Sequence, residues 1–287
     1  MSTGVLLPAA MQGPGEGLTT FARRAEELGY DSLWLPEVSH REVIGAAGWL
    51  LGQTDRIRVG TAIASAYARD ASTAAMAART LGELSNGRFD LGLGVSIRWL
   101  VEQRGQHWEK PLAKAAAYLD AYHAHELHSP PPPSPVPLYF AAHGPRLVET
   151  VKDRVDGLLT INVPPDHTAD VRRELGPNKR LLVIKTVVPE TDPVAARERA
   201  RETVGVYLQA RQYWTLWPKY GFDDSDNVPG GSDRIIDMLV AWGDGDAIAT
   251  QIEEYFEAGA DEVIIRFPTS GEDVISWDLF EALAPGR

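Results

Sequence analysis

The stretch that decides the fold is LGELSNGRFDLGLGVS, residues 81–96. Apolar residues recur every three or four positions between 74 and 84, which predicts a helix, and Asn86-Gly87 supplies the left-handed turn that ends it. A short apolar strand follows over 89–93, carries two glycines and ends at Val95-Ser96. Glycine in a strand marks a close approach by something else. The carboxyl end of this strand is therefore predicted to be a binding edge.

The same order of an apolar-faced helix, a small turn and a short apolar strand recurs along the chain. Buried strands are predicted at 4–9, 31–36, 57–63, 88–94, 136–142, 158–163, 180–188 and 262–267. Eight strands that alternate with helices predict an α/β protein, a closed (β/α)8 TIM barrel, since an open doubly wound sheet of this length has fewer strands. The barrel is expected to form a single domain over 1–287.

Two connections are longer than a minimal barrel needs, namely 97–135 after the fourth strand and 192–245 after the seventh. Insertions at the carboxyl ends of barrel strands often shape the substrate pocket. The second insertion contains the aromatic segment 213–222. A pocket wall, simple packing and a contact in a homodimer all stay open for this segment.

Composition narrows the class of protein. Hydrophobic residues make up 44% and charged residues 24% of the 287 residues, as in globular proteins. The balance of 28 basic against 40 acidic residues gives a formal charge of −12, which argues against nucleic acid and anionic membranes as partners. There is no cysteine, so disulfides and thiolate chemistry are excluded. With no basic leader and no apolar run of ~18 residues, we expect a soluble, cytoplasmic protein.

The residues that follow each strand form the ring where a TIM barrel places its active site. This ring is rich in small residues and poor in nucleophiles, which suits a large planar cofactor better than acyl transfer. The candidate cofactor-binding residues lie after the third to sixth strands: Thr61, Ala62, Ile63, Gly94, Val95, Ser96, Ala142, His143, Gly144, Pro145 and Asn162.

The exit of the fifth strand is the best candidate for binding an anion. Gly144 lets the chain approach a ligand, and Pro145 suits the first turn of a helix, whose free amides can hold a phosphate. Arg146 follows directly. An ordinary strand-to-helix turn is the alternative interpretation.

His40 lies just past the second strand, three residues after Glu37. A histidine there can exchange protons near neutral pH, and a carboxylate can orient it, so both are candidate catalytic residues. A surface or packing histidine is the alternative. His123, His125 and His128 lack the spacing of helical zinc ligands, and no metal site is predicted.

Five segments in register resemble the bacterial-luciferase-like superfamily of flavin- and deazaflavin-dependent oxidoreductases. They are AEELGYDSLWLPE (25–37), RIRVGTAI (56–63), TLGELSNGRFDLGLGVS (80–96), PLYFAAHGPR (137–146) and YFEAGADEVII (255–265). The segments DPVAARERAR (192–201) and YWTLWPKYGF (213–222) are further similar to a branch assigned to coenzyme F420, the deazaflavin.

The resemblance implies a barrel with insertions and a tricyclic ring seated over the strand ends. It implies a bulge with a non-proline cis peptide within 61–64, and a phosphate site at 142–145. It also places Glu37 and His40 at the reactive edge of the ring.

We therefore expect a coenzyme F420-dependent oxidoreductase that passes a hydride between the cofactor and a small organic substrate. His40 would manage the substrate proton, with Glu37 orienting it. An FMN-dependent monooxygenase is the alternative within the superfamily. A barrel that binds the cofactor without turnover is the alternative from another class, since Ile97 stands where related chains often carry histidine.

Overall fold

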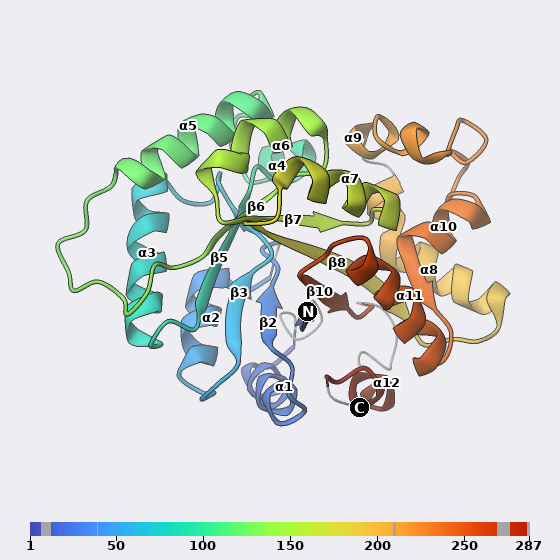
Figure 1. Cartoon of the computed structure of the whole chain (residues 1–287), viewed down its shortest axis with the longest axis horizontal. Coiled ribbons are helices and arrows are strands. Elements are labelled where there is room, and N and C mark those ends of the chain that lie inside the picture. The colour runs from blue at the N-terminus through green and yellow to red at the C-terminus, as the bar shows by residue number, and fades with distance from the viewer. Residues whose placement is uncertain (7–12, 39, 209–210, 269–275, 286–287) are drawn as a thin grey trace.

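The computed structural model describes residues 1–6, 13–38, 40–208, 211–268 and 276–285. Over these residues, parallel strands close into a barrel of the predicted order (Figure 1). The barrel strands are β1 (Ser2–Leu6), β2 (Ser32–Leu35), β3 (Arg58–Thr61) continued by β4 (Ala64–Ser65), β5 (Phe89–Gly94), β6 (Leu138–Ala141), β7 (Gly157–Ile161), β8 (Arg180–Val188) and β10 (Glu262–Arg266). Because β10 pairs with both β8 and β1, the sheet closes. The predicted TIM barrel is confirmed.

Helices cover the outside of this barrel. They are α1 (Gly15–Glu27), α2 (Val43–Leu51), α3 (Ala71–Leu84), α5 (Pro111–Ala124), α6 (Pro145–Val151) with the short η2 (Lys152–Arg154), α7 (Pro165–Leu175), α11 (Gly245–Glu257) and α12 (Trp277–Ala282). The start of α3 is fixed by Asp70, whose carboxylate accepts the Thr73 amide at 2.9 Å. Its end is fixed by Asn86 and Gly87, with φ of 56° and 84°, as the sequence predicts.

The two predicted insertions are present. The first contains α4 (Arg98–Gln103) and α5, and the second contains α8 (Pro193–Leu208), α9 (Arg211–Trp214), η3 (Trp217–Tyr220), α10 (Asp233–Leu239) and β9 (Val240–Trp242). The strand β9 was not predicted. It pairs with residues 186–188 of β8, starting at Thr186, where the pairing with β10 ends, and so joins the second insertion to the barrel sheet.

Most of the aromatic segment 213–222 is used for packing. Trp217 is fully buried and Tyr213 nearly so, in a cluster with aliphatic residues of α8 and α10. This cluster, which we call the insertion core, is separate from the main core between barrel and helices.

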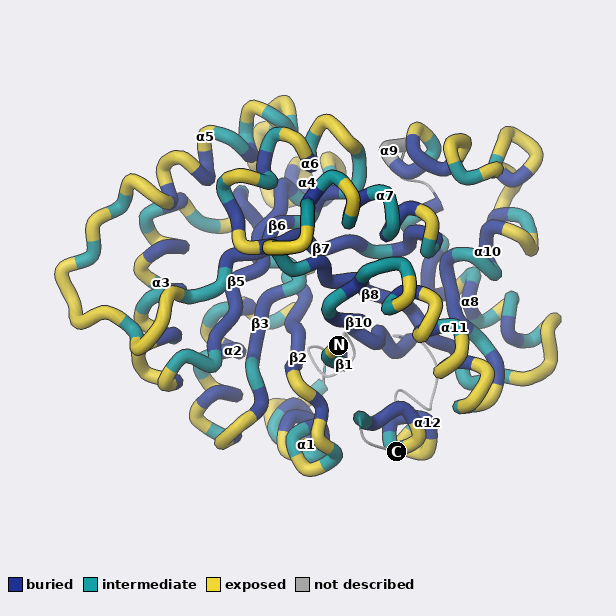
Figure 2. The backbone as a smooth tube through the Cα atoms, viewed as in Figure 1, coloured by how far each residue is buried: buried dark blue, intermediate teal, exposed yellow. Residues whose placement is uncertain are grey.

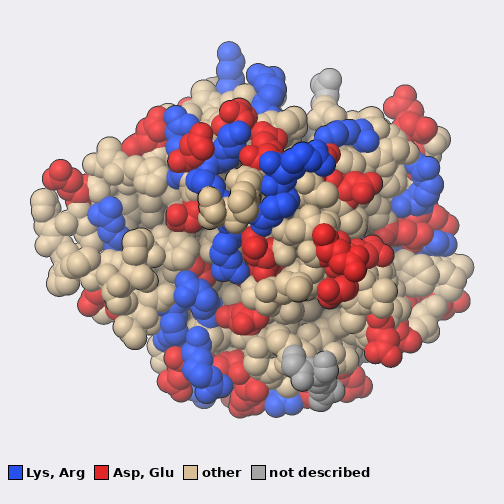
Figure 3. All heavy atoms as spheres, in the orientation of Figure 1, with Lys and Arg blue, Asp and Glu red and all other residues tan. Residues whose placement is uncertain are grey.

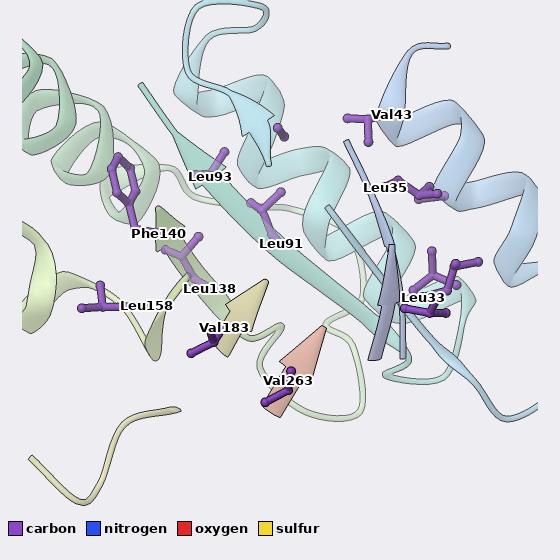
Figure 4. Close-up of a cluster of buried hydrophobic side chains, with 14 of the residues drawn as sticks. Leu33, Leu35, Val43, Leu91, Leu93, Leu138, Phe140, Leu158, Val183 and Val263 are labelled. Carbon is purple, nitrogen blue, oxygen red and sulfur yellow. The ribbon is translucent and has the colours of Figure 1, made fainter. Parts of the chain in front are cut away.

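The strands alternate between two apolar layers, as the two-residue period requires. Figure 4 shows side chains such as Leu91, Leu138 and Val183 in the main core between strands and helices. The alternate positions, including Trp34 and Tyr139, fill the barrel interior. Figure 2 accordingly shows buried strands surrounded by helices with an exposed outer side.

Charges of both signs are interspersed on the face drawn in Figure 3, rather than gathered by sign. Among the helices that the structure describes, none is long and apolar enough to cross a membrane. A single domain over 1–287 stays a prediction.

Candidate functional site

The third barrel strand is interrupted at the carboxyl side of the barrel. Its pairing with β5 runs to Gly60 opposite Asp90 and resumes at Ala64 opposite Leu93. The chain thus advances four residues on one strand against three on the other, which defines a bulge with one extra residue. The peptide between Ala62 and Ile63 is cis, within the range that the resemblance implied.

The glycines of β5 make room for this bulge. A side chain at Gly92 would place its Cβ 2.0 Å from the Thr61 carbonyl oxygen, and one at Gly94 would lie 2.9 Å from Ile63 Cδ1. The close approach that the sequence predicts at these glycines is therefore present. The neighbouring strand fills that space, and the resulting surface is what a ligand would meet.

Thr61 supports the bulge through two hydrogen bonds to β5. Its hydroxyl donates to the Gly92 carbonyl at 2.7 Å and accepts the Gly92 amide at 3.0 Å, replacing the hydrogen bonds that the broken ladder loses. Because this side chain is buried and fully engaged, we assign it to holding the bulge. Ala62 and Ile63, which follow Thr61, are half-buried. Together with Ala141 and Ile161 they pack against the interior cluster at the carboxyl end of the barrel. These four residues form what we call the apolar floor.

Two residues beside the floor have a left-handed backbone. Ser96 follows β5 with φ of 61° and is half-buried, whereas its predecessor Val95 is buried. Asn162 follows β7 with φ of 56°. Asn162 is 1% exposed, yet within the part of the chain that the structure describes neither its Oδ1 nor its Nδ2 has a hydrogen-bond partner. A buried amide without partners is costly, so this side chain is suited to a ligand that supplies them.

His143, at the exit of β6, is fixed in one orientation. Its Nε2 accepts the amide of Ile161 at 3.0 Å, and its carbonyl accepts a bond from His167 Nε2 at 2.8 Å. Burial, and then the nearby His167, lowers the pKa of His143 to about 3. The imidazole is therefore neutral at physiological pH, with its proton on Nδ1. It can donate a hydrogen bond from Nδ1, and it is unsuited to acid-base work.

At the predicted phosphate site, fewer backbone amides are free than the sequence implies. Helix α6 begins after Gly144, but the amides of Leu147 and Val148 both donate to the Gly144 carbonyl, at 3.0 and 3.1 Å. Ala142 is buried, with its amide bonded to the Leu159 carbonyl. In the described part of the chain, this leaves the amides of His143, Gly144 and Arg146 and the Arg146 side chain as the groups in this turn that can meet an anion.

Glu37 does not orient His40. Its carboxylate accepts the Ser65 amide at 2.7 Å and both terminal nitrogens of Arg69, which also binds Glu42 at 2.8 Å. Glu37 thus ties the exit of β2 to the segment just after the bulge, and among the described residues no hydrogen bond joins it to His40. His40 itself is exposed.

One residue of the barrel mouth was missing from the predicted site. Arg266, the last residue of β10, is buried, and its Nη1 donates to Thr186 Oγ1 at 3.1 Å. The sequence could have shown this, because every second residue of a strand faces the same side and Arg266 is two residues after the apolar Ile264. Among the described residues, no group of three or more acidic, histidine or cysteine side chains is placed to hold a metal ion.

Comparison with known proteins shows which family the sequence matches. The family model of luciferase-like monooxygenase matches residues 1–262. The chain belongs to this family. The sequence is 24% identical to the 5,10-methylenetetrahydromethanopterin reductase of Methanolobus tindarius over 86% of this chain and 89% of the relative. The resemblance seen in the sequence is confirmed, and with it the assignment to oxidoreductases.

Solved structures of other oxidoreductases share the fold. An F420-dependent secondary alcohol dehydrogenase, in complex with an F420-acetone adduct, matches with a TM-score of 0.78 at 18% identity, over 99% of this chain and 98% of that one. The oxygenating constituent of 3,6-diketocamphane monooxygenase from Pseudomonas putida, in complex with FMN, matches with a TM-score of 0.68 at 15% identity, over 99% and 97%.

Proposed function

We propose that this luciferase-like protein is a coenzyme F420-dependent oxidoreductase acting on a small organic substrate. The observation that carries the proposal is the unpartnered Asn162 amide next to the apolar floor. Asn162 directly follows Ile161, which shares that floor with Ala62 and Ile63. A flat heterocycle with polar edges offers both an apolar face and hydrogen bonds to such an amide. The similarity to F420-dependent relatives supports the choice of deazaflavin.

The residues present fit this cofactor. The floor residues Ala62 and Ile63 would contact the ring, Asn162 and the Nδ1 proton of His143 would bond its polar edge, and the turn at 144–146 would hold its phosphate. When bound, the deazaflavin supplies hydride transfer, and the protein supplies position and exclusion of water. Gly94, Val95 and Ser96 form the adjacent rim.

The proton that accompanies the hydride is assigned to His40. This residue is exposed after β2, and its side chain is free of the Glu37 carboxylate, which Arg69 holds. His143 cannot serve, because its pKa of about 3 keeps it neutral. Replacing His40 by Ala is expected to lower kcat by at least ~100-fold with cofactor affinity unchanged. His128→Ala, at another exposed position, is the control and should leave kcat unchanged.

The cofactor is tested by titrating the full-length protein with F420 and with FMN in separate experiments, following the absorbance and fluorescence of each. Saturable binding of F420 is expected. Binding of FMN alone would replace the proposal by the FMN-dependent monooxygenase, and binding of neither would remove both. Bound F420 that is neither reduced nor oxidised across a broad panel of alcohols, aldehydes and enones would indicate a barrel without turnover.

We also expect the protein to act in the cytoplasm, and a homodimer is our working hypothesis for its assembly. Sedimentation at micromolar concentration tests the second expectation.

A further inference from the structure

Arg266 points into the mouth of the barrel. Along β10, Ile264 belongs to the interior cluster, and alternation puts Arg266 on the same face one step nearer the carboxyl end. Its register partners are Leu6 on β1, also in the interior cluster, and Thr186 on β8. The guanidinium is therefore an inward-facing group, 8% exposed, at the end where the cofactor is proposed to bind.

This guanidinium differs from the other arginines of the barrel strands. Arg58 is paired with Asp90 at 2.6 Å, and Arg180 with Glu262 at 2.9 Å. Arg266 is more buried than either, yet its partners within the described residues are neutral. They are the hydroxyl of Thr186 and the face of the Tyr207 ring, 6.0 Å from the guanidinium carbon.

The other buried cation of this region has polar partners of its own. Lys185, the neighbouring buried cation on β8, donates to the Met238 carbonyl at 2.7 Å and to the Tyr255 hydroxyl at 3.0 Å, and burial lowers its pKa to about 7. A guanidinium stays charged at any physiological pH, so a buried one needs a negative partner. For Arg266 that partner is best supplied by a ligand.

We propose that Arg266, positioned by Thr186, forms an oxyanion subsite that binds a carboxylate or phosphate group of the substrate. The inference rests on the proposed function for where the cofactor sits. The floor and Asn162 belong to strands β3, β6 and β7, and the phosphate turn follows β6. In the closed sheet order, β10 lies opposite β5, and β5 stands between the floor strands β3 and β6. The anion at Arg266 therefore belongs to the molecule on the side of the mouth that faces the floor.

The experiment measures anion binding rather than turnover. The full-length protein is titrated with inorganic phosphate and with benzoate by calorimetry and thermal shift, at ionic strength held constant with chloride. Benzamide, the neutral counterpart of benzoate, is the ligand control. Arg266→Met is compared with Arg173→Met, which removes an arginine of α7 whose side chain is 75% exposed.

Both anions, but not benzamide, are expected to bind the unmodified protein and to raise its Tm. The apparent Kd should weaken at least ~10-fold in Arg266→Met and stay within twofold in Arg173→Met. Equal anion binding in Arg266→Met, or none in the unmodified protein, would overturn the subsite. Arg266→Gln repeats the measurement if the methionine variant does not fold.

Deazaflavin titration of the same variants separates the two proposals. Arg266→Met should bind F420 as the unmodified protein does, because the anion belongs to the substrate. Loss of F420 binding in this variant would reassign Arg266 to the cofactor and overturn the substrate subsite. Failure of the unmodified protein to bind F420 would end the proposed function, and the phosphate titration would still decide whether Arg266 binds anions.

Discussion

The two ends of the barrel interior treat buried polar groups in opposite ways. At the amino end, Asp90 and Glu262 are 1% and 2% exposed, and each carboxylate is paired with a guanidinium. At the carboxyl end, the described residues offer Asn162 no hydrogen-bond partner, and those that contact Arg266 are neutral. The amino end is complete in the folded chain, whereas the carboxyl end lacks partners that a ligand can supply.

The amino end forms one connected network. Besides Arg180, Glu262 binds the Ser32 hydroxyl and Trp34 Nε1, the latter at 2.8 Å. Burial raises the pKa of Glu262, and the bonds from Ser32 and the charge of Arg180 act against that rise. Such a network stabilises the fold only while all its members are present.

The largest effect is expected from breaking this network. Glu262→Ala leaves Arg180 without its carboxylate and removes one of the two acceptors of Trp34 Nε1, so the free energy of unfolding should fall by about 3–5 kcal/mol. Urea unfolding measures it. Glu27→Ala, whose carboxylate is 64% exposed, is the control and should stay within ~0.5 kcal/mol. A loss near the control value for Glu262→Ala would contradict the view of a tightly coupled amino end.

Lys185 of β8 bonds residues of α10 and α11, and its burial predicts a stability that depends on pH. Its pKa is about 7 in the folded protein and ~10.4 when unfolded, so between these values the unfolded chain binds more protons. Stability should therefore rise from pH 7 to 9, by roughly 2–3 kcal/mol, and be lost again as pH falls to 7. Unfolding curves at both pH values measure this rise, and Lys185→Met should abolish it. An equal rise in the variant would assign it to other groups.

The next largest loss of stability is expected when Thr61 no longer supports the bulge. Thr61→Val keeps the shape of the side chain but leaves the amide and carbonyl of Gly92 unpaired, which should cost about 1–3 kcal/mol. Thr61→Ser keeps the hydroxyl and should cost less than ~1 kcal/mol. Chemical denaturation of the pair measures the difference, and equal losses would show that the hydroxyl has no such role.

The smallest effect on stability is expected at the carboxyl end. Asn162→Gly keeps the left-handed backbone and removes an unpaired amide, so the free energy of unfolding should change by less than ~1 kcal/mol. Affinity for F420 should nevertheless fall about tenfold. Asn86→Gly makes the same change in an exposed turn with the same φ, and should not affect binding. Unchanged affinity in Asn162→Gly would remove this residue from the site.

Local pattern was sufficient for most of the framework. The seventh barrel strand was predicted at 180–188 and is β8 with those bounds, because an apolar run between a Gly-Pro turn and an acidic exit has few other readings. The three-residue β9 was missed, since IIDMLVAW continues the apolar spacing of α10 without a break.

The site was predicted less completely, because its contacts join residues far apart in the sequence. The bond of Glu37 to Arg69 spans 32 positions, and Glu37 has a closer neighbour in sequence in His40. Likewise the pattern around Gly92 shows that a side chain is missing, but not that Thr61 occupies the space. The left-handed Asn162 was found by its place after a strand, whereas its lack of partners required the structure.

The separate insertion core has a consequence for how this enzyme could acquire new substrates. Val204, Trp217 and Leu239 pack with one another rather than with the main core. Tyr213 of this core meets His143 of the site, with 5.4 Å between the ring centroids, so substitutions in the core can change the site while the bulge, with its tightly packed Gly92, stays intact. Divergence or directed evolution of specificity is therefore expected to concentrate in residues 192–242 and to spare β3 and β5.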